Sequence, residues 1–305
     1  MKKFGIDVSA WQKGFNFAKA KAEGVEFVVL RGAYSAPGVV DGAGRDTCFV
    51  DFYAKVKAQG LPVGAYQYSM ATNKEEALAE ALYFEKNVLQ GRQFDLPVYI
   101  DLEDRRVKTA GKTKITEIAK AWCEYLESKG YFVGIYASRS FFSEYLNDSE
   151  LQNYAHWVAQ WTKEPTYKGN NGVFGMWQFG GETNKIRTNI VAGVVCDQNY
   201  MMVDYPTIIK KAKLNGYGNK TIQKVETVQK VETKKEIKVG DLVYFSGGKH
   251  YVSASSGFGF KAKEGKAKVT NFAKGKKHPY HVVHTDNKSN VYGWVDESAV
   301  KLLDT

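Results

Sequence analysis

Eight short apolar runs, each closing on a polar or aromatic residue, follow one another along the first two thirds of the chain. They lie at residues 2–9, 26–34, 61–69, 97–104, 131–137, 156–161, 174–179 and 194–199. Apolar residues recur at three- and four-residue spacing between several of them, which predicts helices over 15–23, 47–59, 74–90 and 113–129. Gly60 and Gly130 directly follow two of these segments, as is typical of helix ends.

Strands that alternate with helices predict a parallel sheet, and eight of them over about 205 residues predict a closed, TIM-like (β/α) barrel. The connections between residues 155 and 197 are too short or too rich in glycine for full helices, so we expect an irregular barrel that lacks some of them. Reactive groups of such barrels lie at the C-terminal ends of the strands. We therefore expect the following side chains to meet at one mouth: Asp7, Arg31, Tyr66, Tyr68, Asp101, Glu103, Trp161, Gln178 and Asp197.

The run at 97–104 ends in alternating carboxylates. Successive side chains of a strand point to opposite faces, so Asp101 and Glu103 share one face and Leu102 lies on the other. Two like charges that lie close together raise one pKa and leave the other group ionised. Acid-assisted cleavage of a glycoside needs such a pair. The alternative is an Asp-Leu-Glu segment that only caps the next helix.

Six short motifs carry a resemblance to a known family. They are Asp-Val-Ser-x-Trp-Gln from residue 7, Arg-Gly-x-Tyr from 31, Gly-Ala-Tyr-x-Tyr from 64, Asp-Leu-Glu from 101, Trp-Gln-Phe from 177 and Asp-Gln-Asn-Tyr from 197. In this order they resemble glycoside hydrolase family 25, the Chalaropsis-type lysozymes (N-acetylmuramidases) that occur as phage endolysins and bacterial autolysins. The resemblance covers about residues 4 to 203.

The resemblance implies a role for each carboxylate. Glu103 matches the proton donor, Asp101 the group that orients or stabilises the substrate, and Asp7 and Asp197 the flanking acids of the pocket. The residues that we assign to substrate binding are Arg31, Tyr66, Tyr68, Tyr136, Trp161, Trp177 and Gln178. The implied reaction cleaves the β-1,4 bond between N-acetylmuramic acid and N-acetylglucosamine in peptidoglycan. We expect retention of configuration, with the substrate acetamido oxygen as the nucleophile.

Two alternatives stay open. A non-catalytic wall lectin could keep the barrel for sugar binding, although it has no need of a proton donor. A chitinase-like hydrolase shares the acetamido chemistry, but we would expect it to carry a longer acidic strand motif than Asp-Leu-Glu.

Length and composition exclude several other classes. A chain of 305 residues with 44% hydrophobic residues suits one large and one small domain. No run approaches the ~20 apolar residues of a membrane span, and residues 1–3 lead straight into the first strand without an apolar export segment. Cys48, Cys123 and Cys196 lie far apart in apolar surroundings, so we expect buried free thiols and no disulfide framework.

Positive charge is concentrated in the last third of the chain. The formal net charge is +10, yet residues 1–205 are balanced; residues 206–238 hold nine Lys and three Glu, and residues 239–305 hold ten Lys and six acids. Clustered cations attract polyanions over a Debye length of ~8 Å. Because no Arg, the preferred phosphate clamp, follows Arg187, the charge favours an anionic bacterial wall over nucleic acid.

A polar, Lys-rich stretch divides the chain. Gln-Lys-Val-Glu-Thr at 223–227 recurs at 229–233, which favours an extended tether over a short solvated helix or strand. The predicted domains are a catalytic barrel at 1–207, a basic linker at 208–238 and a second domain at 239–305.

The second domain reads as β-strands throughout. Apolar runs at 239–245, 268–272, 280–285 and 291–295 predict a small all-β barrel, and Gly-Trp-Val at 293–295 resembles the SH3-like wall-binding barrels of many lysins. His281 and His284 would lie on opposite faces of a strand, so we expect no metal site. We expect part of its aromatic set to form a binding surface: Tyr251, Phe258, Phe260, Tyr280, Tyr292 and Trp294.

Together these features predict a phage-type endolysin with an SH3-like wall-binding domain. Its expected partners are peptidoglycan and, as a further ligand, anionic wall polymers; we expect no cofactor, nucleic acid, membrane insertion or obligate protein partner. We expect synthesis in the host cytoplasm without a signal peptide, and action on the wall after the membrane is permeabilised.

Overall fold

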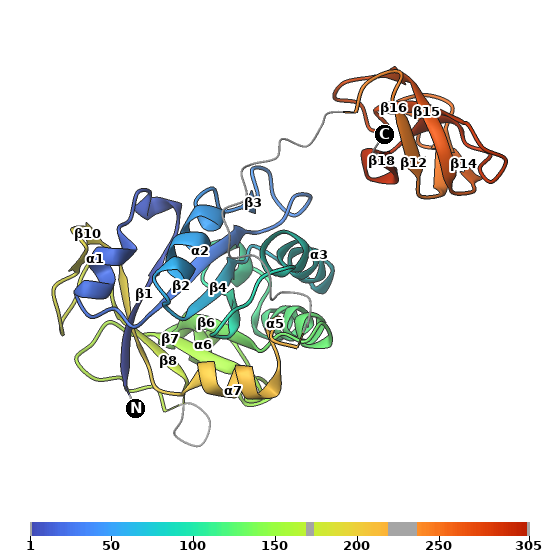
Figure 1. The fold of residues 1–305 in the computed structure, drawn as a ribbon. Helices are drawn as coiled ribbons and strands as arrows, with labels where there is room; N and C mark the ends of the chain where they lie inside the picture. The colour runs from blue at the N-terminus through green and yellow to red at the C-terminus, as the bar shows by residue number, and fades with distance from the viewer. Residues whose placement is uncertain (1, 169–173, 219–236, 304–305) are drawn as a thin grey trace. The chain divides into compact units, whose positions relative to one another are not determined.

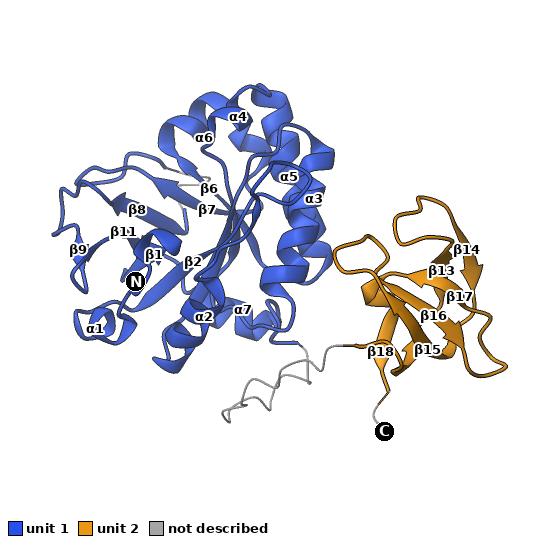
Figure 2. Cartoon of the chain, turned by 90° about the horizontal axis from the view of Figure 1, so that it is seen from above, with its two compact units in different colours: residues 1–225 blue, residues 226–305 orange. Residues whose placement is uncertain are grey.

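A computed structural model describes residues 2–168, 174–218 and 237–303. The chain divides into two compact units, residues 1–225 and residues 226–305 (Figure 2). Each unit has a hydrophobic core of its own. No helix in the described segments has the length and apolar character needed to cross a bilayer.

Eight strands of the first unit form a closed barrel (Figure 1). In pairing order they are β1 (Lys3–Val8), β11 (Asp197–Met201), β8 (Met176–Gly180), β7 (Ala155–Ala159), β6 (Val133–Ser138), β5 (Val98–Asp101), β4 (Val63–Tyr68) and β2 (Phe27–Tyr34). Pairing of β2 with β1 closes the ring, and the two-residue strand β3 (Gly44–Arg45) extends the sheet beside β2. The predicted eight-stranded barrel is therefore confirmed.

One strand departs from the predicted parallel arrangement. β11 pairs antiparallel with both β1 and β8, whereas the other pairs around the ring are parallel. A parallel return needs a crossover, usually a helix. Instead, β8 and β11 are joined by a loop with the hairpin β9 (Ile190–Val191) and β10 (Val194–Val195). The chain therefore re-enters the barrel at the end where it left.

Helices cover the outside of the barrel over its first six strands. They are α1 (Phe17–Ala22), α2 (Phe49–Ala58), α3 (Lys74–Phe84) with the following π-turn η2 (Glu85–Leu89), α4 (Arg105–Lys108), α5 (Lys112–Ser128) and α6 (Arg139–Tyr145). Gly60 and Gly130 have φ of +67° and +83° just beyond α2 and α5, as the sequence predicts. Among the described residues, no helix lies between β7 and β11, which agrees with the expected gaps.

The first unit continues past the predicted boundary at residue 207. Helix α7 (Tyr205–Ala212) buries Tyr205 and Ile209, and Asn215 is fully buried beyond it. The Asn215 Nδ2 donates to Leu96 O over 2.8 Å, and its Oδ1 accepts from Phe132 N over 2.7 Å. The described chain up to residue 218 therefore belongs with the barrel, and the repeats at 223–233 lie outside the described residues.

The second unit is one antiparallel sheet of seven strands. In pairing order they are β14 (Gly259–Ala262), β13 (Gly248–Tyr251), β17 (Tyr292–Val295), β16 (Tyr280–His284), β15 (Gly265–Phe272), β12 (Leu242–Phe245) and β18 (Val300–Leu302). Alternate residues such as Val243, Phe245 and Val282 fill its core. Within residues 237–303 the only helical segment is the single turn η4 (Glu297–Ala299), so the all-β prediction is confirmed there.

The structure shows where the cysteines and two of the histidines lie. Cys48, Cys123 and Cys196 are free and buried, as predicted. His284 is exposed on β16, whereas His281 is partly buried between the rings of Tyr292 and Trp294.

Candidate active site

The barrel mouth holds a cavity of about 600 Å³. Asp7 lies one residue before the end of β1, Asp101 is the last residue of β5, and Glu103 follows two residues later. Asp197 begins β11, and its Cα is paired with that of Asp7. Because β11 is antiparallel, its first residue lies at the mouth where the parallel strands end. Four carboxyl groups from distant segments thus line one cavity.

The cavity collects ten of the eleven side chains that the sequence assigns to the site. They are Asp7, Arg31, Tyr66, Tyr68, Asp101, Glu103, Tyr136, Trp161, Gln178 and Asp197. The exception is Trp177, which is fully buried outside the cavity. Its indole packs against Phe179 and Tyr200 and donates to Gln160 O over 2.8 Å. Side chains alternate along β8, so Gln178 faces the cavity and Trp177 cannot.

Gln178 fixes several groups of the cavity wall. Its Oε1 accepts hydrogen bonds from Tyr136 Oη over 3.0 Å and from Trp161 Nε1 over 3.1 Å, while its Nε2 donates to Asp7 Oδ2 over 3.2 Å. Asn199 Nδ2 donates to the same Asp7 oxygen over 2.7 Å. The amide of Gln178 therefore orients two aromatic side chains and one carboxylate.

Burial and mutual repulsion keep protons on this carboxyl cluster. Burial, opposed by the hydrogen bonds from Asn199 and Gln178, raises the pKa of Asp7 to about 6. Burial, followed by the charges of Asp7 and Glu103, raises the pKa of Asp197 to about 8. The cluster therefore holds protons near neutral pH that isolated carboxyl groups would release.

Asp101 is the most enclosed carboxyl group of the cluster. Burial, followed by the charges of Glu103 and Asp7, raises its pKa well above the ordinary range. The residue is 4% exposed, and its Oδ1 has no hydrogen-bond partner among the described residues. A buried polar atom without a partner is rare in folded proteins. This oxygen is therefore available to a polar group of a ligand.

Glu103 lies at the more open side of the cavity. Desolvation, followed by the charge of Asp104, raises its pKa, and Lys108 opposes the shift. The sequence predicts a raised pKa from Asp101 and apolar neighbours. The direction and the role of burial are confirmed, but the largest charge effect on the pKa of Glu103 comes from Asp104 and not from Asp101.

Arg31 is held by a residue that the sequence analysis missed. Its Nε donates to Asp46 Oδ2 over 2.8 Å, and the same oxygen accepts from Ala10 N over 3.0 Å. Asp46 is 6% exposed and also accepts from Cys48 N through Oδ1 over 2.9 Å. No strand pattern surrounds Asp46, so the sequence carried no signal for this role.

Seven further residues line the cavity without having been predicted: Val8, Ser9, Trp11, Gln12, Glu182, Val195 and Cys196. Trp11 is 84% exposed on the one-turn helix η1 (Ala10–Gln12), whose N-terminus is capped by reciprocal hydrogen bonds between Ser9 and Gln12.

Gly181 is also required at the cavity, because a Cβ at this position would overlap the Asp197 carboxylate and crowd the Trp161 ring. The Asp-Val-Ser-x-Trp-Gln motif contained the signal for Ser9, Trp11 and Gln12.

The chain that forms this site is similar in sequence to known proteins. Residues 6–187 match the model of the family described as glycosyl hydrolases family 25. The "Autolytic lysozyme" of Clostridium acetobutylicum is 29% identical over 159 residues, which cover 52% of this chain and 44% of the relative. The match thus spans less than half of the relative's length.

Solved structures share the fold. The CTP1L endolysin matches with a TM-score of 0.56 and 23% identity, covering 69% of each chain. The bacterial lysozyme of Streptomyces coelicolor matches with a TM-score of 0.56 and 21% identity, covering 70% of this chain and 98% of that one. The catalytic domain of endolysin ply40 from bacteriophage P40 of Listeria monocytogenes matches with a TM-score of 0.52 and 22% identity, over 69% and 98% of the chains.

Proposed function

Since the chain belongs to glycosyl hydrolases family 25, we propose that it cleaves the β-1,4 bond between N-acetylmuramic acid and N-acetylglucosamine in peptidoglycan. The observation that carries this proposal is the convergence of Asp7, Asp101, Glu103 and Asp197 on one cavity walled by aromatic side chains. Glycoside cleavage needs an acid that is protonated near the working pH and a negative group beside it.

Glu103 is the proton donor in this proposal. Its raised pKa keeps a proton available, and it lies on the exposed side of the cluster, where a leaving sugar oxygen can reach it. General acid catalysis contributes about 10²–10⁴-fold to such reactions. The more deeply buried Asp101 is less suited to give its proton to an entering polymer.

Asp101 then orients the substrate acetamido group. Its buried Oδ1 lacks a partner in the described residues, and an acetamido N–H would supply one. That hydrogen bond would favour the ionised form of Asp101 and direct the acetamido oxygen towards the anomeric carbon. The resulting displacement by the substrate's own oxygen gives net retention. Across the cavity, Asp7, which has the lower pKa of the two, would stabilise positive charge on the sugar ring, and Asp197 would position the sugar.

The test is the Glu103→Gln variant. We expect it to lose wall lysis by at least about 10²-fold while keeping the melting temperature and the wall binding of the parent protein. Glu117→Gln, which alters an exposed carboxylate on the outer helix α5, is the matched control and should lyse walls normally. Near-normal lysis by Glu103→Gln would reject the assignment.

Product analysis separates the proposed reaction from its alternatives. Mass spectrometry of the released muropeptides should find N-acetylmuramic acid at the new reducing ends, and proton NMR of the first product should find the β anomer. A chitinase-like hydrolase would cut chitin oligomers instead, and a lectin would release no sugar. Release of the α anomer would reject the acetamido mechanism but not the bond specificity.

We further propose that the second unit is an SH3-like domain that binds the bacterial wall. Six rings lie on or beside four neighbouring strands, β14, β13, β17 and β16. This aromatic row consists of two groups of contacting rings, Phe258, Phe260 and His250, and Tyr292, His281 and Trp294. Phe258, Phe260 and Tyr292 are 70%, 52% and 66% exposed. Large exposed apolar groups that lie together usually mark an interaction site, and the surrounding lysines suit an anionic wall polymer.

The biological role that we propose is that of a phage-type endolysin, made in the host cytoplasm and active once the membrane is permeabilised. The three buried free thiols support synthesis in a reducing compartment. Cells of a susceptible host that express the full chain should stay intact until the membrane is permeabilised. Lysis without permeabilisation would contradict this role.

A further inference from the structure

Asp104, the residue after Glu103, is held on both carboxylate oxygens although it does not line the cavity. It is the N-cap of α4, where its Oδ1 accepts from Arg106 N over 2.7 Å. Its Oδ2 accepts from Tyr68 Oη over 2.9 Å. The Glu103 side chain, in contrast, makes no hydrogen bond or ion pair with another described residue. The position of Glu103 therefore depends on the segment that Asp104 anchors.

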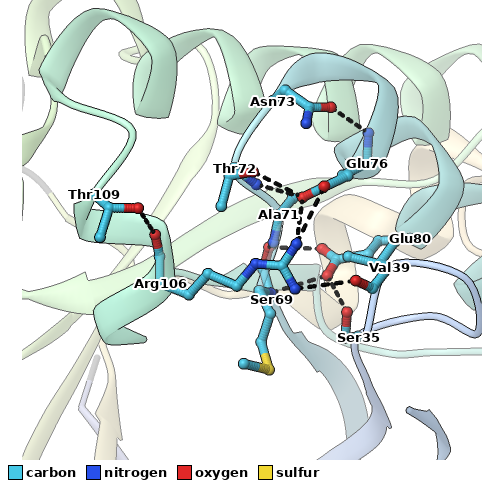
Figure 3. A network of polar contacts seen from close by, with 11 residues as sticks. Ser35, Val39, Ser69, Ala71, Thr72, Asn73, Glu76, Glu80, Arg106 and Thr109 are labelled. Atoms are coloured by element: carbon cyan, nitrogen blue, oxygen red, sulfur yellow. Dashed lines mark hydrogen bonds and ion pairs between the residues drawn. The ribbon is translucent and has the colours of Figure 1, made fainter. Parts of the chain in front are cut away.

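The tyrosine that holds Asp104 is itself fixed. The Tyr68 ring stacks on Tyr34 with the ring centres 5.3 Å apart and the planes 11° apart. The fully buried Glu80 of α3 joins the residues just beyond both tyrosines (Figure 3). It accepts from Ser35 Oγ and Ser69 Oγ over 2.6 Å each. The ends of β2 and β4 are thus tied together at the residues that directly follow Tyr34 and Tyr68.

The other side of Asp104 is anchored through Arg106. The Arg106 guanidinium donates to Val39 O over 3.0 Å and to the two Glu76 carboxylate oxygens over 3.2 and 3.3 Å (Figure 3). Glu76 in turn accepts from Thr72 N over 2.8 Å. Helix α4 is therefore bonded to the loop after β2 and to the start of α3. The bonds of Glu80 to Ser35 and Ser69 belong to the same region but do not involve α4.

We propose that Asp104 is a positioning residue for Glu103: held by Tyr68 and by the first turn of α4, it fixes the segment that carries Glu103 and places a negative charge beside the Glu103 carboxyl group. The proposal rests on the proposed function of Glu103 as the acid. Neither the family motifs nor the comparisons assign a role to Asp104.

Several charged or titratable groups interact with Glu103, and they come from different elements. They are Asp104 and Lys108 of the α4 segment, Asp101 of β5, Asp7 of β1, Asp197 of β11, Tyr68 of β4 and Tyr136 of β6. After desolvation, Asp104 has the largest effect on the pKa of Glu103 and raises it. Removing the charge of Asp104 should therefore lower the pKa of Glu103.

The experiment compares Asp104→Asn with Asp104→Glu in the full chain. Asparagine keeps an oxygen for the α4 cap and removes the charge, whereas glutamate keeps the charge and disturbs the cap. For Asp104→Asn we expect the basic limb of kcat against pH to move to lower pH, with lysis near neutral pH falling several-fold. For Asp104→Glu we expect a lower melting temperature with the basic limb closer to its wild-type position.

A second readout does not depend on turnover. The carboxyl ¹³C signal of Glu103, assigned by its loss in Glu103→Gln, should titrate at lower pH in Asp104→Asn than in the wild type. An unchanged NMR midpoint would overturn the role of Asp104, even if the enzyme is slower. Normal wall lysis by Glu103→Gln would instead reject Glu103 as the acid, while the NMR comparison would still test the Asp104 charge.

Discussion

At the scale of single residues, the site contains buried carboxyl groups whose ionised forms destabilise the folded chain. Asp7 and Asp197 are paired across β1 and β11, and both are desolvated together with Asp101. Carboxyl groups in such a position bind protons more tightly in the folded chain than in the unfolded one. The same arrangement that holds a proton for catalysis therefore makes stability depend on pH.

The Asp197→Asn variant tests this dependence of stability on pH. The pKa of Asp197 is about 8 in the folded protein and about 3.9 in an unfolded chain. Its contribution to stability is therefore fully present below about pH 4 and is lost as the pH rises through about 8. Asparagine cannot ionise, so the variant should melt a few degrees above the wild type at pH 8–9 and lose this advantage near pH 4.

Thermal unfolding of both proteins across this pH range is the measurement, and wall lysis should fall in the variant. Asp204→Asn, at a partly exposed aspartate outside the cavity, serves as the control with no such gain at high pH. A melting-temperature difference that does not vary with pH would contradict the prediction.

At the scale of elements, the sequence predicted what depends on local periodicity. The strand and helix patterns located the eight barrel strands, and the gaps in the helical layer followed from glycine content and loop length. The direction of β11 was not predictable, because the same apolar run fits a parallel or an antiparallel strand. Asp197 reached the mouth nevertheless, through the start of a reversed strand.

Alternation along a strand explains both a success and an error. Tyr66 and Tyr68 were placed correctly because the motif spacing follows the strand period of two. Trp177 and Gln178 are neighbours on β8, so at most one of them can face the cavity, and the motif alone did not decide between them. Asp46 was missed because its partners Arg31, Ala10 and Cys48 meet only in the folded chain.

Asp46 is also the residue through which three elements meet. It joins η1, Arg31 of β2 and the start of α2 while being almost fully buried. Asp46→Ala would leave the Arg31 charge without its partner, and breaking a buried pair on one side costs about 3–5 kcal/mol. We expect a fall in melting temperature of roughly 10 °C, together with weaker substrate binding because Arg31 and η1 lose their common anchor.

Differential scanning calorimetry and the KM for a soluble glycan measure the two effects. Asp51→Asn, which alters an exposed ion pair with Lys55 on the same helix, is the control and should change the unfolding free energy by less than about 0.5 kcal/mol. An equal effect of Asp46→Ala and Asp51→Asn would contradict the role given to Asp46.

At the scale of the whole molecule, the proposed functions assign glycan cleavage to the first unit and wall binding to the second. The first unit contains the carboxyl cluster, and its residues 1–205 carry balanced charge, whereas the basic excess lies in residues 206–305. The second unit has its own core of valines and Phe245. Such a division lets one unit stay on an insoluble polymer while the other works at high local concentration.

The second unit should fold and bind the bacterial wall without the first unit. Residues 237–305, which include Ile237 because it packs on the core, should unfold cooperatively and label Gram-positive walls without releasing sugar. Phe260→Ala combined with Tyr292→Ala should abolish labelling, whereas Phe272→Ala, at an exposed ring outside the aromatic row, should not. Labelling should weaken but persist as salt is raised, because salt screens the lysines and leaves the ring contacts. Fluorescence microscopy of susceptible cells is the measurement, and a folded fragment that leaves those walls unlabelled would reject the wall-binding role.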